Sequence, residues 1–391
     1  MKLTNLNPWR DKKSIAQSIT AIVCGLSLSA CQLTQPNHAS QASTEQSAPQ
    51  TIIISGSNKA PYDGGIYQTT LNPKTGELSP IVKLANAISP SYLAWDPANK
   101  ETLYSVIQTK TGGLGILNRK SDNALYESIF SQTELAWAPC HIGLSPDNSQ
   151  VAIANYMSGD IHLFDVDGAK TTLASHYKHH GKGTHQRQES PHLHWINWSP
   201  SGKHLFSIDL GTDSIYGYNF KNGKIVDSYV AFKTQSEDGP RHMAFHPNKD
   251  LAYVINELSN TIIVLAYDAK TGMFNQLQRI NTVDKSHVGH SQAAAIKVSK
   301  DGNFVYVSNR GANSIAGFKV NSDGTLVYLH NQSTGGDWPR DFTISADGQY
   351  VLVANRRSNT INVLKRDVKT GYLSATPHVL NVPDPTFISP F

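Results

Sequence analysis

The feature that most constrains the fold of this chain is a unit of short strands and turns that recurs about every fifty residues. One clear copy spans 239–268, GPRHMAFHPNKDLAYVINELSNTIIVLAYD. It predicts a short strand at 243–245, a His-Pro-Asn turn, a second strand at 251–256, a polar turn and a third strand at 261–267. Short β-branched runs separated by polar turns are typical of antiparallel strands.

The second strand, turn and third strand of this unit recur along the chain. The copies are IANYMSGDIHLF (153–164), SIDLGTDSIYGY (207–218), VINELSNTIIVL (254–265), VSNRGANSIAGF (307–318) and VANRRSNTINVL (353–364), with a weaker copy at 105–117. The turns that precede the second strands are 46 to 54 residues apart. Four short strands per period of this length indicate the blades of a β-propeller and argue against a sandwich.

Seven segments have the pattern of the innermost strand of a blade. They begin near residues 90, 139, 193, 240, 293, 339 and 385. The last has no strands after it, and the first strands of the chain, from residue 51, have no inner strand before them. We therefore predict an all-β fold, a seven-bladed β-propeller over 51–391, in which the C-terminal strand completes the N-terminal blade. Such closure hides strand edges; six or eight blades are the alternative counts.

The N-terminus has a separate pattern. A basic segment precedes an apolar run at 15–30, and Leu28-Ser29-Ala30-Cys31 resembles the lipobox of bacterial lipoproteins. We predict a lipoprotein signal peptide at 1–30, a lipidated Cys31 followed by a flexible linker over 31–50, and a lipid-anchored protein that faces the periplasm. An uncleaved anchor and an ordinary signal peptide are the alternatives.

Charge and cysteine content argue against a nucleic-acid-binding protein and against a protein stabilised by disulfides. The formal net charge is +4, but basic residues of the first thirty positions carry most of it, so the remainder gives no basis for nucleic-acid binding. The chain has three cysteines, Cys24, Cys31 and Cys140. With Cys24 removed and Cys31 lipidated, Cys140 has no partner for an intramolecular disulfide.

Comparison of the repeats identifies two variable positions. The second residue of each inner strand is Ser91, Cys140, His194, Arg241, Ala294, Arg340 or Thr386. The residue after the second strand is Tyr156, Leu210, Glu257, Arg310 or Arg356. A purely structural position would favour one residue type. Both positions should lie near the central channel of a propeller, so these side chains are expected to converge at one mouth.

Five of these residues form a chemically coherent set, namely His194, Arg241, Glu257, Arg310 and Arg340. Imidazole and carboxylate are common general bases, and guanidinium groups bind a carboxylate, a phosphate or a developing oxyanion. His242, beside Arg241, is a further candidate; a salt bridge between blades is the structural alternative. The asparagines that recur in register, such as Asn155 and Asn256, indicate turn chemistry instead.

The longest insertion between blades contains six histidines in HYKHHGKGTHQRQESPHLHW (176–195). His192 and His194 are expected to share one face of a strand, where His192 is a further candidate for substrate binding. The segment has Gly and Lys but no matched carboxylate or cysteine pair. We therefore interpret it as a loop that covers substrate, with a zinc site as the less favoured alternative.

Several elements together resemble a known family. They are GPRHMAFHPN followed by VINEL, RQESPHLHWINWSPSGKHLFSIDLGTDSIYGY, and SKDGNFVYVSNRGANSIAGF. From residue 51 to the C-terminus the chain is similar to seven-bladed propeller lactonases of the 6-phosphogluconolactonase type, a family related to fungal carboxymuconate cycloisomerases. The resemblance implies hydrolysis of an intramolecular ester. We predict that this reaction needs no metal or other cofactor.

The resemblance also implies a pocket built from a His, the Arg of a Pro-Arg-His element, the Glu of Asn-Glu-Leu and further arginines. In this sequence they correspond to His194, Arg241, Glu257, Arg310 and Arg340. Glu257 and His194 both remain candidates for the base. The expected partners are a small lactone and the membrane, and the protein is expected to be a monomer. A non-catalytic binding propeller of the envelope and a cycloisomerase are the alternative functions, and the lactone itself stays open because phosphorylated sugar lactones belong to cytoplasmic metabolism.

Overall fold

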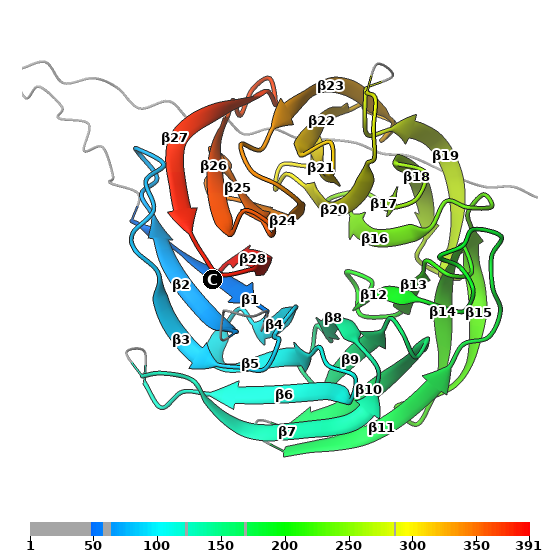
Figure 1. The fold of residues 1–391 in the computed structure, drawn as a ribbon. Coiled ribbons are helices and arrows are strands. Elements are labelled where there is room, and N and C mark those ends of the chain that lie inside the picture. Colours follow the sequence, from blue (N-terminus) through cyan, green and yellow to red (C-terminus); the bar gives the residue numbers. More distant parts are fainter. Residues whose placement is uncertain (1–47, 58–63, 122–123, 168–169, 285–286) are drawn as a thin grey trace, which may run out of the picture. The chain divides into compact units, whose positions relative to one another are not determined.

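The computed structural model describes residues 48–57, 64–121, 124–167, 170–284 and 287–391. These residues form 28 strands in seven four-stranded sheets, arranged as blades around a central channel (Figure 1). The prediction of an all-β, seven-bladed propeller is confirmed. The predicted signal peptide, Cys31 and nearly all of the predicted linker lie outside the described residues. Across the described ranges, the structure contains no helix with the length and apolar character needed to cross a membrane.

The blades follow one another around the ring, each with its first strand nearest the channel. Blade 1 contains β28 (Pro385–Pro390), β1 (Gln50–Gly56), β2 (Gly65–Leu71) and β3 (Val82–Asn86). Blade 2 contains β4 (Leu93–Asp96), β5 (Asn99–Ile107), β6 (Gly112–Asn118) and β7 (Glu127–Ala136). Blade 3 contains β8 (Pro139–Leu144), β9 (Gln150–Asn155), β10 (Asp160–Asp167) and β11 (Lys170–Lys178). Blade 4 contains β12 (Leu193–Trp198), β13 (Leu205–Asp209), β14 (Ser214–Lys221) and β15 (Lys224–Lys233).

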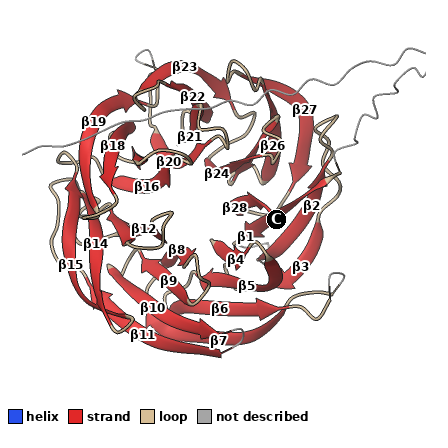
Figure 2. Cartoon of the chain, turned by 180° about the vertical axis from the view of Figure 1, so that it is seen from behind, coloured by secondary structure: helices blue, strands red, loops and turns tan. Residues whose placement is uncertain are grey.

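The remaining blades have the same order. Blade 5 contains β16 (Pro240–Phe245), β17 (Leu251–Asn256), β18 (Thr261–Asp268) and β19 (Met273–Asn281). Blade 6 contains β20 (Gln292–Val298), β21 (Phe304–Arg310), β22 (Ser314–Val320) and β23 (Leu326–Ser333). Blade 7 contains β24 (Pro339–Ile344), β25 (Tyr350–Asn355), β26 (Thr360–Arg366) and β27 (Leu373–Asn381). Viewed from behind, the ring consists of strands and loops alone (Figure 2).

Burial explains why the second strands are continuous apolar runs. Every residue of β17 and of β25 is buried, because each middle strand is covered on both faces by neighbouring blades. The outermost strands, such as β27, have many exposed positions. The core therefore lies between blades: Phe206 of blade 4 packs with Met243 and Tyr267 of blade 5 in one such layer. Full burial of an apolar side chain of this size contributes about 1.5–3 kcal/mol.

Pairing between the two ends of the propeller closes the ring. β28 pairs antiparallel with β1, with Ile388 opposite Ile54 and Phe387 opposite Ser55. The Phe387 ring lies 4.7 Å from that of Tyr92, which precedes the first strand of the next blade. This arrangement confirms the predicted closure and removes the two free edges that a linear array would leave.

Candidate active site

A β-bulge turns one side chain of several inner strands toward the channel. In β16, Pro240 pairs with Asn256 and His242 pairs with Ile255, which leaves Arg241 as an extra residue between them. A bulge of this kind re-aims the side chain of the extra residue. The same register shift occurs at Cys140 in β8, His194 in β12 and Arg340 in β24. Thus the variable second position of the repeat is the bulged residue.

The other variable position supplies the rest of the wall. Tyr156 and Glu257 directly follow β9 and β17, and Arg310 is the last residue of β21. Together with the bulged residues they enclose a cavity of about 210 Å³. Its lining consists of Gln108, Ala138, Cys140, Tyr156, Arg187, His194, Glu257, Arg310 and Arg340. The structure therefore brings both positions of the repeat to one site, and Arg241 lines the small adjoining space with Cys140 and Arg340.

Glu257 lies at the centre of three guanidinium groups. Its Oε1 is 2.6 Å from Nη1 of Arg187, and its Oε2 is 2.8 Å from Nη2 of Arg310 and 3.0 Å from Nε of Arg241. Burial by itself would raise the pKa of Glu257, but Arg310, Arg241 and Arg187 outweigh burial and hold that pKa well below its usual range. Glu257 is therefore a carboxylate, with little tendency to take up a proton.

The first strand of blade 6 holds two of these arginines in place. Arg310 donates from Nε to the carbonyl of Gln292 at 3.2 Å and from Nη2 to that of Ala293 at 3.1 Å. Arg241 donates from Nη1 to the carbonyl of Ala294. Ala294, at the variable position of this blade, has only a small side chain, and the long side chain of Arg241 reaches its carbonyl from blade 5. Burial and the charge of Arg310 lower the pKa of Arg241 to about 10, so it stays charged at neutral pH.

Arg340 differs from the other three arginines of the site because its side chain makes no ion pair or hydrogen bond with any other described residue. Burial, followed by Arg241 and Arg356, lowers its pKa to about 9, which still leaves it charged at neutral pH. Arg187, Arg241, Arg310 and Arg340 face one carboxylate, so the site has an excess of three positive charges. An anionic group on a ligand is the natural counter-charge for such a site.

His194 is a neutral imidazole in the wall of the same cavity. Burial and the charge of Arg241 hold its pKa well below the usual value, despite the opposing effect of Glu257. It is therefore unprotonated at neutral pH, which is the form that a general base needs. Its Nδ1 lies 3.9 Å from Sγ of Cys140. Burial raises the pKa of Cys140 to about 12, so Cys140 is a thiol and not an activated nucleophile.

Arg187 is a site residue that the repeat comparison missed. It comes from the insertion between β11 and β12, and besides Glu257 it contacts the hydroxyl of Tyr156, 3.1 Å from Nη2. The next residue, Gln188, fixes the loop because its buried Nε2 donates to the carbonyl of Leu210 at 2.8 Å and to Oδ1 of Asp213 at 2.7 Å. The signal in the sequence was the Arg-Gln pair of the family-like element RQESPHLHW.

The two other predicted histidines lie outside the 210 Å³ cavity. The His192 ring stacks on Tyr156 with 4.5 Å between centroids, and its Nδ1 lies 2.9 Å from the Tyr156 carbonyl oxygen. It thus supports a wall residue from outside the lining. His242 lines the small adjoining space, where its Nε2 accepts from Nη1 of Arg241 at 3.1 Å. A role for either histidine in substrate binding stays a prediction.

A second, larger cavity of about 1080 Å³ is also lined by His242. Tyr92, His141 and Trp195 contribute to its wall, with Lys297, whose ammonium lies 3.7 Å from Oδ1 of Asp341. Size alone would favour this cavity as the ligand site. We choose the smaller one because converging charges and a buried base define a reactive site better than volume does.

The fold and this cationic pocket define a class: a seven-bladed propeller whose channel is suited to an anionic small molecule. The family described as Lactonase, 7-bladed beta-propeller matches residues 51–390, and the chain belongs to this family. It is 36% identical to the 6-phosphogluconolactonase of Bacillus subtilis over 329 residues, which cover 83% of this chain and 93% of that protein.

Two of the similar solved structures show the extent of the match. A protein from Lactobacillus plantarum superposes with a TM-score of 0.81 at 31% identity, covering 87% of this chain and 99% of that one. The periplasmic gluconolactonase of Pseudomonas aeruginosa gives a TM-score of 0.80 at 26% identity, covering 88% and 99%. The similarity to all three proteins spans the whole propeller rather than single blades.

The environment of Glu257 predicts the effect of its neutral isostere on stability. Glu257→Gln leaves three buried or half-buried guanidinium groups without their counter-charge, so we expect the free energy of unfolding to fall by about 3–5 kcal/mol. Urea unfolding at neutral pH measures the change. The exposed Glu101→Gln serves as the matched control and should change stability by less than about 1 kcal/mol. Equal stability of the two variants would contradict a stabilising role for the ion pairs between Glu257 and the three arginines.

Proposed function

We propose that this protein hydrolyses a sugar lactone to the corresponding hydroxy acid. The observation that carries the proposal is a neutral, buried imidazole, His194, in one small cavity with a surplus of guanidinium groups. The similarity to a 6-phosphogluconolactonase and to a gluconolactonase supports a sugar lactone as the substrate class. A base and cationic donors are what ester hydrolysis through an oxyanion requires.

The reaction needs one water molecule and no covalent enzyme intermediate. The His194 imidazole takes a proton from water as the oxygen attacks the lactone carbonyl carbon. The resulting tetrahedral oxyanion is stabilised by guanidinium donors of the cavity wall. When the ring C–O bond breaks, the imidazolium returns the proton to the leaving alkoxide. The product is the open-chain hydroxy acid, ionised at neutral pH.

The surroundings of Glu257 support His194 as the base. Both of its oxygens are held by guanidinium groups at 2.6–3.0 Å, and its pKa is well below the usual range. The pKa of His194 is also below its usual value, but among the described residues its ring pairs with no guanidinium group, whereas Glu257 is held in three ion pairs. We therefore assign the base role to His194 and a positioning role to Glu257, which orients Arg187, Arg241 and Arg310 around the substrate.

The charge of the site supports a lactone that carries an acidic group. Arg340 has no partner among the described residues and borders the cavity, so we propose that it binds a phosphate or carboxylate of the substrate. Arg187 comes from the inserted loop, and its side chain is partly exposed. Of the three arginines paired with Glu257, it can therefore most easily leave that carboxylate and bind an anionic group of the substrate instead. Through Arg187, the inserted loop would form part of the substrate site.

We further propose that the protein is exported and anchored by a lipid on Cys31, with the propeller as its folded domain. The basic segment, apolar run and Leu28-Ser29-Ala30-Cys31 of the sequence support this proposal. A periplasmic gluconolactonase among the similar structures is compatible with it.

The base assignment predicts a large effect of His194→Gln on the chemical step. We expect kcat on gluconolactone to fall by roughly 10²- to 10⁴-fold. The control variant His378→Gln, on the outermost strand of blade 7, should have a kcat near that of the wild type. Because the active form of His194 is unprotonated and its pKa lies below the usual 6.5, kcat/KM of the wild type should remain level as pH drops through 6.5. Initial rates corrected for spontaneous hydrolysis measure both effects. An acid limb centred at 6.5, or an active His194→Gln variant, would reject the assignment.

The free guanidinium of Arg340 predicts discrimination between phosphorylated and unphosphorylated lactones. We expect Arg340→Gln to raise KM for 6-phosphogluconolactone by about 10- to 100-fold, the value of one charged hydrogen bond, with a smaller change for gluconolactone. Arg119→Gln removes the same charge outside the cavity lining and should change neither KM. Equal effects of Arg340→Gln on both lactones would argue against a phosphate subsite.

The lipidation proposal predicts where the protein is found after cell fractionation. The wild type and Cys24→Ala, which alters a cysteine upstream of the expected cleavage, should both sediment with membranes. Cys31→Ala should appear in the soluble fraction because the acyl chains have no attachment point. If Cys31→Ala also sediments with membranes, Cys31 is not the anchor.

A further inference from the structure

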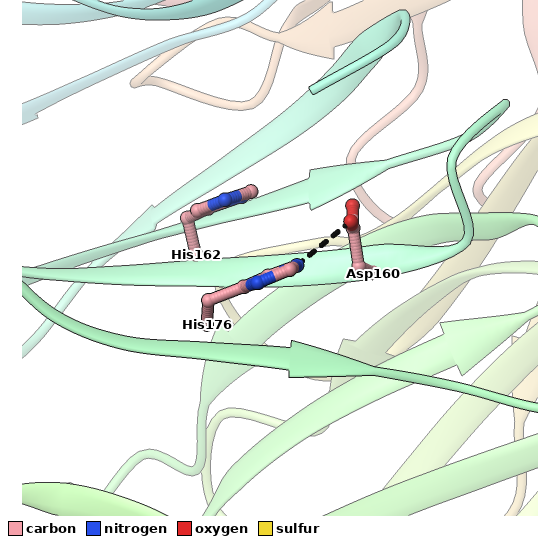
Figure 3. A group of neighbouring side chains, drawn as sticks. All are labelled: Asp160, His162 and His176. Atoms are coloured by element: carbon pink, nitrogen blue, oxygen red, sulfur yellow. Dashed lines mark hydrogen bonds and ion pairs between the residues drawn. The ribbon is translucent and has the colours of Figure 1, made fainter. Parts of the chain in front are cut away.

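Three potential metal ligands meet on one face of blade 3, away from the cavity lining. Asp160 and His162 are two residues apart on β10, and His176 of β11 lies directly opposite His162 in the register of the two strands. Figure 3 shows the two imidazoles and the carboxylate on the same side of the sheet. One imidazole nitrogen from each histidine and one carboxylate oxygen all lie within 4.8 Å of one another.

The donor set has a defined chemical preference. Two imidazoles and one carboxylate suit Zn²⁺ and related transition-metal cations, whereas Mg²⁺ and Ca²⁺ prefer oxygen donors alone. Ligand atoms around a tetrahedral Zn²⁺ stand about 3.3 Å apart, so the longest of the three separations, which is at most 4.8 Å, has to shorten. The two rings are stacked with 6° between their planes, so His176 has to turn out of the stack before both imidazoles can direct an in-plane lone pair at one cation. The exposed side chain of His176 can make that movement by rotation about its side-chain bonds.

Surrounding residues hold the carboxylate in a suitable orientation. Asn155 Nδ2 and Ser158 Oγ both donate to Oδ1 of Asp160, at 2.9 and 2.7 Å. The other oxygen, Oδ2, is thus left to His176, whose Nε2 lies 2.9 Å away. Lys178, the cross-strand partner of Asp160, gives its ammonium to the carbonyl of Ser158. Oriented carboxylates of this kind are typical of the surroundings of metal ligands.

His162 is fixed in the interior of the blade. Its residue surface is 3% exposed, and its Nδ1 accepts from Nδ2 of Asn155 at 3.0 Å. His176 stacks on it with 4.4 Å between ring centroids and 6° between planes. A cation bound by His176 and Asp160 would take the place of the contact between Nε2 and Oδ2 of these residues.

The other blades provide an internal comparison. At the position of Asp160, blades 4 to 7 have Ser214, Thr261, Ser314 and Thr360. At the position of His162 they have Tyr216, Ile263, Ala316 and Asn362, and opposite these stand Val230, Arg279, Asn331 and Val379. A small polar residue at the first position is therefore part of the repeat. The cross-strand pair of histidines occurs in blade 3 and in none of these four described blades.

We propose that Asp160, His162 and His176 bind one divalent transition-metal cation of the Zn²⁺ type, with its remaining coordination positions open to solvent. The site joins β10 to β11, the strand that leads into the loop carrying Arg187. Bound cation would fasten the outer edge of blade 3. The proposal is independent of the lactonase proposal, because none of the three residues lines the cavity.

The test is titration of the purified full chain, prepared without a polyhistidine tag and treated with chelator, with ZnCl₂ by calorimetry. We expect one equivalent of Zn²⁺ per chain and a rise of a few degrees in melting temperature at saturating Zn²⁺. Co²⁺ in place of Zn²⁺ should give visible ligand-field absorption of a nitrogen- and oxygen-ligated ion. No binding at micromolar Zn²⁺ overturns the proposal.

Matched variants separate this site from adventitious binding. His162→Asn copies blade 7, where Asn362 accepts from Asn355 at 3.1 Å as His162 does from Asn155, so it should fold normally. His176→Gln changes an exposed side chain. Both should lower Zn²⁺ affinity at least about tenfold and abolish the thermal shift. The exposed His180→Ala is the control and should bind as the wild type does. Wild-type affinity in His162→Asn and His176→Gln overturns the proposal.

Discussion

The pairing of β28 with β1 is the contact on which the rest of the structure depends. Residues of the candidate site come from blades 2 to 7, so their mutual distances are set by the diameter of a closed ring rather than by any one sheet. Cys140 is a free, buried cysteine, so it adds no covalent link to the described residues. Packing between blades and this one strand pairing therefore position the guanidinium groups to within hydrogen-bonding distance of Glu257.

The closed ring brings three arginines from different parts of the chain to Glu257. Arg241 from blade 5 and Arg310 from blade 6 are both anchored on carbonyl groups of β20, while Arg187 reaches in from the loop before blade 4. The three guanidinium charges attract the carboxylate, and the carboxylate limits repulsion among the guanidiniums. The result is a rigid cationic wall with a neutral imidazole beside it, an arrangement preorganised for an oxyanion.

The fold and most of the site could be predicted from the sequence because both follow the period of the repeat. Turn residues mark the blades, and two positions that vary among copies mark the channel wall, where His194, Glu257 and Arg310 are found. The repeat pattern could not predict contacts between a blade and an insertion. Arg187 has no counterpart in other blades, so its pairing with Glu257 appears only in three dimensions, as does the partnership of His176 with Asp160.

The choice between His194 and Glu257 as the base was likewise beyond the sequence. Both residue types serve as bases elsewhere, and our proposal for His194 depends on the three ion pairs of Glu257, which are seen only in the structure. His192 and His242 were likewise predicted to bind substrate because of their residue type and their position in the sequence. The structure gives His192 a supporting contact with Tyr156 and places His242 against Arg241, farther along the channel.

The bulge at the second residue of the inner strands has an evolutionary consequence. The bulged residue has no partner in the strand register, so its side chain can change without altering the hydrogen bonding of the sheet. Cysteine, histidine and arginine all occupy this position in the present chain. A substitution there can thus alter which ligand is bound while the strand pairing stays the same, so each blade offers the channel one position that is free to vary.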